Sequence, residues 1–234
     1  MDFNNTFNML LPDEFPEEEY SCFMTACKSI LIPVKTDSWR QFAGASNLIM
    51  WRFRSCYEDM KFYIDSWVEH GVNVSRDELY MRERALFGMF SSGVSCIEST
   101  CYAIYSLASH ASIYNLPFGD NEQRRCSPKN LKIALSSHDT ARNIVTELIS
   151  IINSSEWEFW VDLRNRMSHR SNIPRVIRGA GGSSPPPAKA LQFGATSSTP
   201  AFEADEDHLV NLYEWLAQSL RNLLVEGGNI ANNP

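Results

Sequence analysis

The sequence predicts an all-α fold, a single antiparallel helical bundle, on three observations. Apolar residues recur at three- and four-residue spacing over most of the chain, which is the period of one helix face. No segment alternates apolar and polar residues over a length useful for a strand. Residues that start or stop helices flank the periodic segments. The 234 residues are 44% hydrophobic and 21% charged, an ordinary composition for one large or two small soluble domains.

Proline, glycine and capping residues bound the first two expected helices. The first begins after Pro16, where three glutamates suit the positive end of the helix dipole, and Pro33 ends it. The second begins at Thr36 or Asp37, either of which can cap it. It continues without proline until Gly71, a favourable C-terminal stop. Its length indicates a helix that spans the whole bundle.

The third expected helix begins at Ser75, because Ser75 and Glu78 have capping-box spacing. Its apolar pattern continues to about Ala108. The helix is rich in small residues that permit close helix approach, so it is expected to lie at the centre or at a dimer interface: Ser91, Ser92, Gly93, Ser95 and Ser99. Glu98 lies within its apolar part and is interpreted as an exposed or hydrogen-bonded side chain rather than a catalytic one.

The second half of the chain predicts three further helices and one short one. The short helix is expected near 131–135, inside a connecting loop. A strongly amphipathic fourth helix can be capped by Ser137 or Asp139, and Ser155 can cap the fifth. A final helix with leucines on one face is expected to stop at Gly227 and its neighbouring glycine.

The composition changes sharply over 179–204, which is rich in Gly, Ser, Thr and Pro. Such a segment cannot support a packed core, so we expect a flexible loop inserted between two bundle helices. The chain is accordingly interpreted as an N-terminal helical extension, 1–74, packed on a helical bundle, 75–226.

Charge and cysteine content restrict the function. The formal net charge is -7, so any nucleic acid must be held by a local basic patch rather than by the overall field. The six cysteines include no Cys-x-x-Cys pair and no zinc-finger spacing. We therefore expect buried free thiols in a reducing cytosol, and neither a metal nor a cofactor.

The N-terminus and the apolar runs favour a cytoplasmic protein. The first residues lack the basic region of a signal peptide. No uninterrupted apolar run reaches the roughly 20 residues that a membrane helix requires. We expect no membrane association.

The fifth expected helix ends in a basic patch that contains a histidine. On a helix, Arg164 shares a stripe with two tryptophans, while Asn165 and His169 are neighbours one turn apart. Arginine offers a planar fork of donors to a phosphate, and histidine moves protons near neutral pH. Further arginines could hold an RNA backbone: Arg166, Arg170, Arg175 and Arg178. The alternative interpretation is purely structural, because cationic residues at a helix C-terminus also interact favourably with the negative end of the helix dipole.

The residues Leu163-Arg-Asn-Arg-Met-Ser-His-Arg170 resemble the signature of the HEPN superfamily, an arginine followed by four to six residues and a histidine. A polar residue, often asparagine, follows the arginine in that signature. The surroundings are similar too, with the motif on the penultimate long helix and an apolar helix after it. The resemblance covers about 75–226. It implies a helical bundle and, in many members, a metal-independent endoribonuclease.

The resemblance also implies roles for individual residues. Arg164 would stabilise the scissile phosphate, His169 would act as general base or acid, and Asn165 would support them. The site would form across a homodimer, in a toxin–antitoxin, phage-defence or RNA-processing setting. Some members carry a tyrosine two residues after the histidine, where a partner modifies them, but Ser171 stands there. The alternative is a non-catalytic HEPN-like module that dimerises and binds a nucleotide, RNA or a protein partner.

Overall fold

The predicted all-α bundle is confirmed. The computed structural model describes residues 3–4, 9–31, 37–72, 74–124, 126–169, 190–195 and 201–232. Within them the chain forms α1 (Glu17–Leu31), α2 (Asp37–His70), α3 (Arg76–Ala108), α4 (Asp120–Gln123), α5 (Pro128–Leu135), the 3-10 helix η2 (Asp139–Ala141), α6 (Arg142–Asn153), α7 (Ser155–His169) and α8 (Glu206–Asn232). Two strand pairs accompany them, β1 (Phe3–Asn4) with β2 (Leu11–Pro12) and β3 (Gln192–Phe193) with β4 (Phe202–Glu203), both antiparallel.

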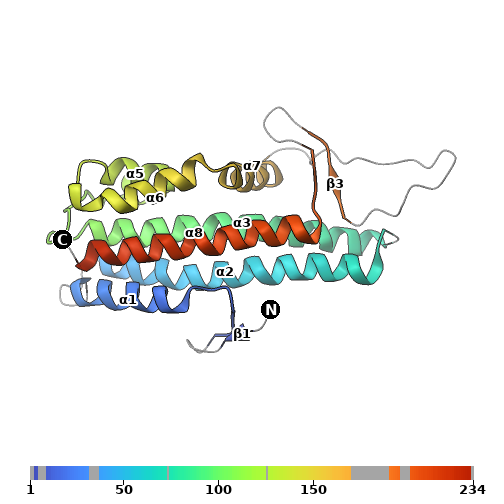
Figure 1. Cartoon of the computed structure of the whole chain (residues 1–234), viewed down its shortest axis with the longest axis horizontal. Helices are drawn as coiled ribbons and strands as arrows, with labels where there is room; N and C mark the ends of the chain where they lie inside the picture. Colours follow the sequence, from blue (N-terminus) through green and yellow to red (C-terminus); the bar gives the residue numbers. More distant parts are fainter. Residues whose placement is uncertain are drawn as a thin grey trace.

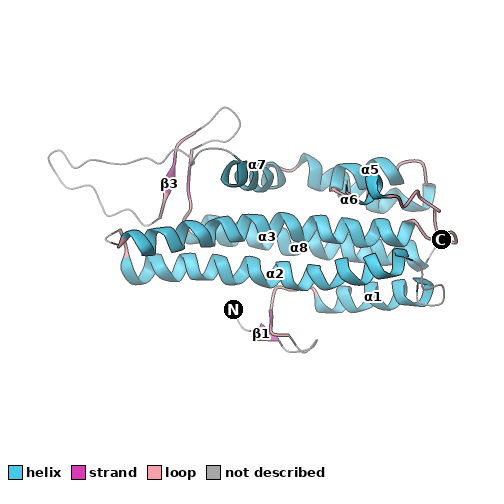
Figure 2. Cartoon of the chain, turned by 180° about the vertical axis from the view of Figure 1, so that it is seen from behind, coloured by secondary structure: helices cyan, strands magenta, loops and turns pink. Residues whose placement is uncertain are grey.

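The long helices form three tiers. Figure 1 shows α3 and α8 in the middle, α1 and α2 on one side, and α5, α6 and α7 on the other, and Figure 2 shows the same tiers from behind. Helix α2 runs opposite to α1 and α3, as an antiparallel bundle predicts. Helix α8 runs in the same direction as α3.

The sequence signals around the α2–α3 turn act as predicted. Gly71 has φ +57°, a left-handed conformation that glycine adopts without steric cost. Ser75 caps α3: its hydroxyl accepts from the Glu78 backbone N–H at 3.2 Å, and its own N–H donates to the Glu78 carboxylate at 2.7 Å. These contacts satisfy donors that an uncapped helix would leave free.

A buried arginine fixes the same turn from inside. Arg82 is fully buried and donates to three oxygens: the Ser66 hydroxyl at 2.8 Å, the Ser66 carbonyl at 2.6 Å and the Gly71 carbonyl at 2.7 Å. Its guanidinium also lies 4.3 Å from the ring centroid of Trp67, a cation–π arrangement. One side chain thereby holds the end of α2 against the start of α3.

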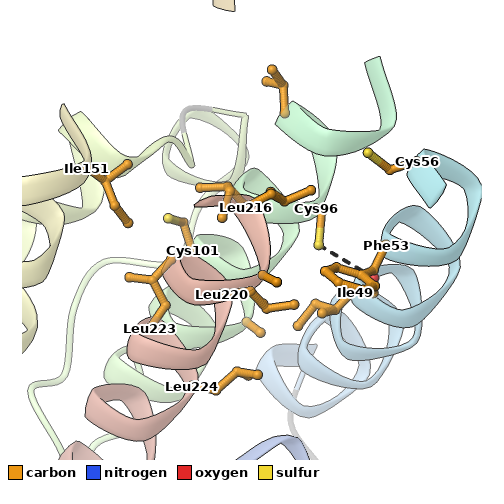
Figure 3. Close-up of a cluster of buried hydrophobic side chains, with 14 of the residues drawn as sticks. Ile49, Phe53, Cys56, Cys96, Cys101, Ile151, Leu216, Leu220, Leu223 and Leu224 are labelled. Carbon is orange, nitrogen blue, oxygen red and sulfur yellow. Dashed lines mark hydrogen bonds between the residues drawn. The ribbon is translucent and has the colours of Figure 1, made fainter. Parts of the chain in front are cut away.

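A single hydrophobic cluster contains residues from both sides of position 74. Figure 3 shows part of it, where α2, α3, α6 and α8 meet: Ile49, Phe53, Cys56, Cys96, Cys101, Ile151, Leu216, Leu220, Leu223 and Leu224. The Cys96 thiol donates to the Ile49 carbonyl at 3.6 Å across α3 and α2. Helix α3 lies at the centre of the bundle, one of the two positions that its small residues predict.

The thiol prediction is correct for four cysteines and wrong for Cys22. All six are free, and those at positions 27, 56, 96 and 101 are buried, while Cys126 is half-buried. Burial raises the pKa of the Cys126 thiol to about 12, because the thiolate loses its solvation. Cys22 is exposed, since it lies on the face of α1 that turns away from the core.

Four helix boundaries differ from the sequence prediction. Helix α8 does not stop at Gly227 but continues to Asn232, and a Cβ at Gly227 would lie only 3.0 Å from Ile104 and Phe23 side-chain atoms. This glycine therefore serves close packing rather than helix termination. Ser154, not Ser155, caps α7, because its hydroxyl accepts from the Trp157 N–H at 3.1 Å.

The helix before α7 also begins differently. Helix α6 follows the 3-10 turn η2 and has no side-chain hydrogen bond at its cap, so neither Ser137 nor Asp139 caps it. The short helix expected near 131–135 starts earlier, at Pro128, with Ser127 as its cap.

Part of the segment expected to be a flexible loop is packed. Within 179–204, Gln192–Phe193 pairs with Phe202–Glu203, and the Leu191 N–H donates to the Tyr63 hydroxyl of α2 at 3.2 Å. The rings of Phe193 and Phe202 stack, 4.7 Å between centroids. These aromatic residues supply an apolar contact that the average composition of the segment conceals. Positions 179–189 and 196–200 lie outside the described residues.

Candidate functional site

Helix α7, which carries the predicted motif, is seated on α3 by one tryptophan. Trp160 is 1% exposed, and its ring lies against Gly93, where an added Cβ would be 2.4 Å from Cζ3 of the indole. The same ring meets Phe90 edge-on, 4.9 Å between centroids. The missing side chain at position 93 therefore lets α7 approach α3 closely. Figure 1 shows α7 nearly end-on, so it crosses the long helices rather than following them.

A second aromatic contact holds α7 from the other side. Phe159 meets Phe202 of β4 at 4.8 Å and His208 of α8 at 5.2 Å, both edge-on. Burial lowers the pKa of His208, an effect that Asp205 partly opposes. Helix α7 is therefore held between α3 and the start of α8. These contacts fix the backbone from which the side chains of the predicted motif extend.

Arg164 faces α3, one turn beyond Trp160. Its Nη2 lies 3.6 Å from Oε1 of Glu98 on α3, with 29% of the arginine side chain and 35% of the glutamate side chain exposed. The Nε atom of Arg164 is buried and makes no hydrogen bond to the described part of the chain. The apolar stripe predicts that Arg164 faces the bundle or a partner subunit, and the structure places it toward α3, beside a carboxylate that was expected to be exposed or hydrogen-bonded.

Glu98 is held in a partly desolvated position. Burial raises the pKa of its carboxyl above the ordinary value, and the neighbouring Arg164 lowers it by a smaller amount. The ion pair therefore does not fully offset the loss of water around the carboxylate. A carboxylate with a raised pKa beside a part-exposed guanidinium is a physically grounded indication of a functional site.

This pKa shift makes a prediction for Glu98→Gln. A raised folded pKa means that the proton-linked stability is present below the unfolded pKa, near 4.5, and is lost as pH rises through the folded pKa. Glutamine does not ionise, so Glu98→Gln should be more stable than the wild type at about pH 7 and equal to it at about pH 4. Urea unfolding at both pH values measures this, with the exposed Glu214→Gln as control. A less stable Glu98→Gln protein at neutral pH would contradict it.

Arg166 does not belong to an exposed RNA-binding patch. Its Nε lies 2.6 Å from Asp162 Oδ2 on the same helix, with only 10% and 15% of the two side chains exposed. A charge neutralised and covered in this way offers little to an RNA backbone. The prediction for Arg166 is therefore corrected: the position faces the protein, because the turn that carries it is packed against the bundle.

The other predicted residues have different outcomes. Asn165 lies on α7 and is half-buried. The backbone of His169 forms the last residue of α7, but its side chain lies outside the described structure. Arg170, Arg175 and Arg178 also lie outside the described residues.

Comparisons with known proteins give no family. No protein-family model matches the chain, and neither the curated proteins nor the solved structures searched include a similar one. None of the helices in the described ranges is both long and apolar enough to cross a membrane. In the same part of the chain, no group of three or more His, Cys, Asp or Glu residues could hold a metal ion.

Proposed function

We propose that this chain is a metal-independent endoribonuclease of the HEPN type. One observation carries the proposal: Arg164 is held at the α3–α7 contact, part-exposed and beside Glu98, on the helix that ends at His169. A guanidinium that served only to stabilise the fold would be expected to resemble Arg166, which is covered and closely paired. The Arg-x4-His spacing with Asn165 supports the same proposal.

The chemistry follows from the groups present. The ribose 2′-hydroxyl attacks the adjacent phosphorus and gives its proton to a base, for which His169 is the candidate. The bond from phosphorus to the 5′-oxygen then breaks, and that oxygen takes a proton from an acid. The products are a 2′,3′-cyclic phosphate and a 5′-hydroxyl. Arg164 would bind a phosphate oxygen and stabilise the extra negative charge of the transition state.

A homodimer completes this proposal. The reaction uses a base and an acid, and the motif supplies one histidine per chain, so two copies would each contribute Arg164 and His169. A chain that light scattering shows to be monomeric at about 10 µM would contradict the composite site, since obligate dimers form well below that concentration.

RNA cleavage without metal tests the function. The wild type, incubated with a diverse RNA pool in EDTA, should cut it and leave cyclic-phosphate ends. Arg164→Ala and His169→Ala should each cleave at least about 100-fold more slowly, because each removes charge stabilisation or proton transfer. Arg142→Ala is the matched control, since it removes an arginine whose side chain is 81% exposed on α6.

The outcomes separate the two hypotheses. Cleavage by the wild type and the control alone supports the enzyme. Equal cleavage by all four proteins would show that the activity comes from elsewhere. A wild type that binds RNA without cutting any of the pool would reject the enzyme and favour the non-catalytic RNA-binding module.

A further inference from the structure

We propose that Glu98 is a positioning residue of the active site, which holds the Arg164 guanidinium from α3 and leaves Nη1 for a substrate phosphate. The proposal rests on the proposed function and goes beyond it, because it assigns a role to a residue far from the motif. Its geometric basis is the 3.6 Å contact between Nη2 of Arg164 and Oε1 of Glu98.

The donor pattern of Arg164 supports this role. Nε and Nη2 present their N–H groups along one edge of a guanidinium, the edge that a carboxylate can accept from side-on. Nη2 already faces Glu98, and Nε is buried without a hydrogen bond. If the Glu98 carboxylate moves slightly closer to that edge, it can accept from both Nε and Nη2. The remaining nitrogen, Nη1, is then directed away from α3.

The backbone is suited to positioning. Trp160 packs on Gly93 and Phe90, which fixes α7 on α3 one turn before Arg164. Arginine loses much rotamer freedom when it is ordered. A second point of attachment, from another helix, supplies part of that ordering before RNA binds. Pre-ordering of this kind lowers the barrier to the reaction rather than the free energy of the bound state.

The pair differs from the structural ion pair next to it. The charged atoms of Arg166 and Asp162 lie 2.6 Å apart, and only 10% and 15% of the two side chains are exposed. The charged atoms of Arg164 and Glu98 are farther apart, at 3.6 Å, and about a third of each side chain is exposed. The charge of Glu98 also opposes an incoming phosphate. Glu98 therefore has two opposite effects: it positions Arg164 for the reaction, and its charge weakens the binding of a phosphate. A glutamate with a purely structural role would not affect RNA binding and the cleavage rate in opposite directions.

The test measures binding and catalysis separately. Binding uses a fluorescent single-stranded RNA with 2′-O-methyl groups throughout, which cannot be cleaved, and catalysis uses single-turnover rates on unmodified RNA. Glu98→Gln keeps an acceptor but not the charge, so it should bind about threefold to tenfold more tightly and keep its rate within about threefold. Glu98→Ala should bind no more weakly than the wild type but react about tenfold more slowly or worse. Glu214→Gln, an exposed change on α8, should alter neither.

The outcomes also separate this proposal from the proposed function. A rate for Glu98→Ala within about twofold of the wild type would overturn it, because positioning would then add nothing. If the wild type does not cleave, opposite changes in binding, weaker for Arg164→Ala and tighter for Glu98→Gln, would support the Glu98–Arg164 arrangement as an RNA-binding site without cleavage. Unchanged binding in both variants would overturn the proposal whether or not RNA is cleaved.

Discussion

We expect Arg82→Leu to lower the free energy of unfolding by about 3 kcal/mol. Leucine fills much of the space but cannot donate to the Ser66 hydroxyl, the Ser66 carbonyl or the Gly71 carbonyl. These part-buried oxygens would lose donors that water can replace only in part, which costs more than the hydrogen bonds themselves contribute. Urea unfolding followed by circular dichroism gives the value.

Two further variants define what Arg82 contributes. Arg52→Leu, on the exposed face of α2, should change stability by less than about 0.5 kcal/mol. Arg82→Lys keeps the charge but not the planar fork, so it should lose most of the same stability. A loss below about 1 kcal/mol in Arg82→Leu would show that the three oxygens find other donors.

The second large effect is expected at the contact between α3 and α7. Gly93→Ala should cost about 2 kcal/mol, because the new methyl group would overlap the ring of the fully buried Trp160. Either the indole or the whole of α7 must move. A displacement of α7 would carry Arg164 away from Glu98, so the proposed RNA cleavage should also fall, by about tenfold.

The chain offers a matched control for this substitution. Gly44 lies inside α2 with nothing within 4 Å of an added Cβ, so Gly44→Ala should be neutral or stabilising by up to about 1 kcal/mol. A smaller side chain at position 160 makes room for the methyl group. The double variant Gly93→Ala/Trp160→Leu should therefore be more stable than the sum of its single effects predicts. Strict additivity would show that the two residues do not compete for space.

Local signals determined much of the fold and could be interpreted from the sequence. Gly71 and the capping box at Ser75 mark a turn that needs only neighbouring residues, and the structure places it there. The prediction that α8 stops at Gly227 was wrong, because the outcome there depends on residues distant in the sequence. Glycine is a weak helix former in isolation, but here the tertiary contact with Phe23 and Ile104 outweighs that preference.

The candidate site was likewise predictable only where local sequence decides the arrangement. The helical stripe through Trp160 predicts that Arg164 faces the bundle or a partner subunit, and the structure places it against α3. Glu98 could not be assigned to the site from the sequence, because its contact depends on how α7 crosses α3. Arg166 was assigned wrongly, because a run of arginines does not show which members are covered. His208, against Phe159, shows no motif that would have indicated its position.

The packing of α8 on α1 has a consequence for synthesis on the ribosome. Glu19 pairs with Arg221 at 3.0 Å, and Phe23 contacts Gly227, so the first long helix docks mainly on the last. Two adjacent glycines disfavour the final turns of α8 by about 1 kcal/mol each until α1 supports them. Helix α1 is synthesised before α8, so its contacts with α8 can form only once α8 has been made. The face of α1 that docks on α8 must be kept from other nascent chains until then.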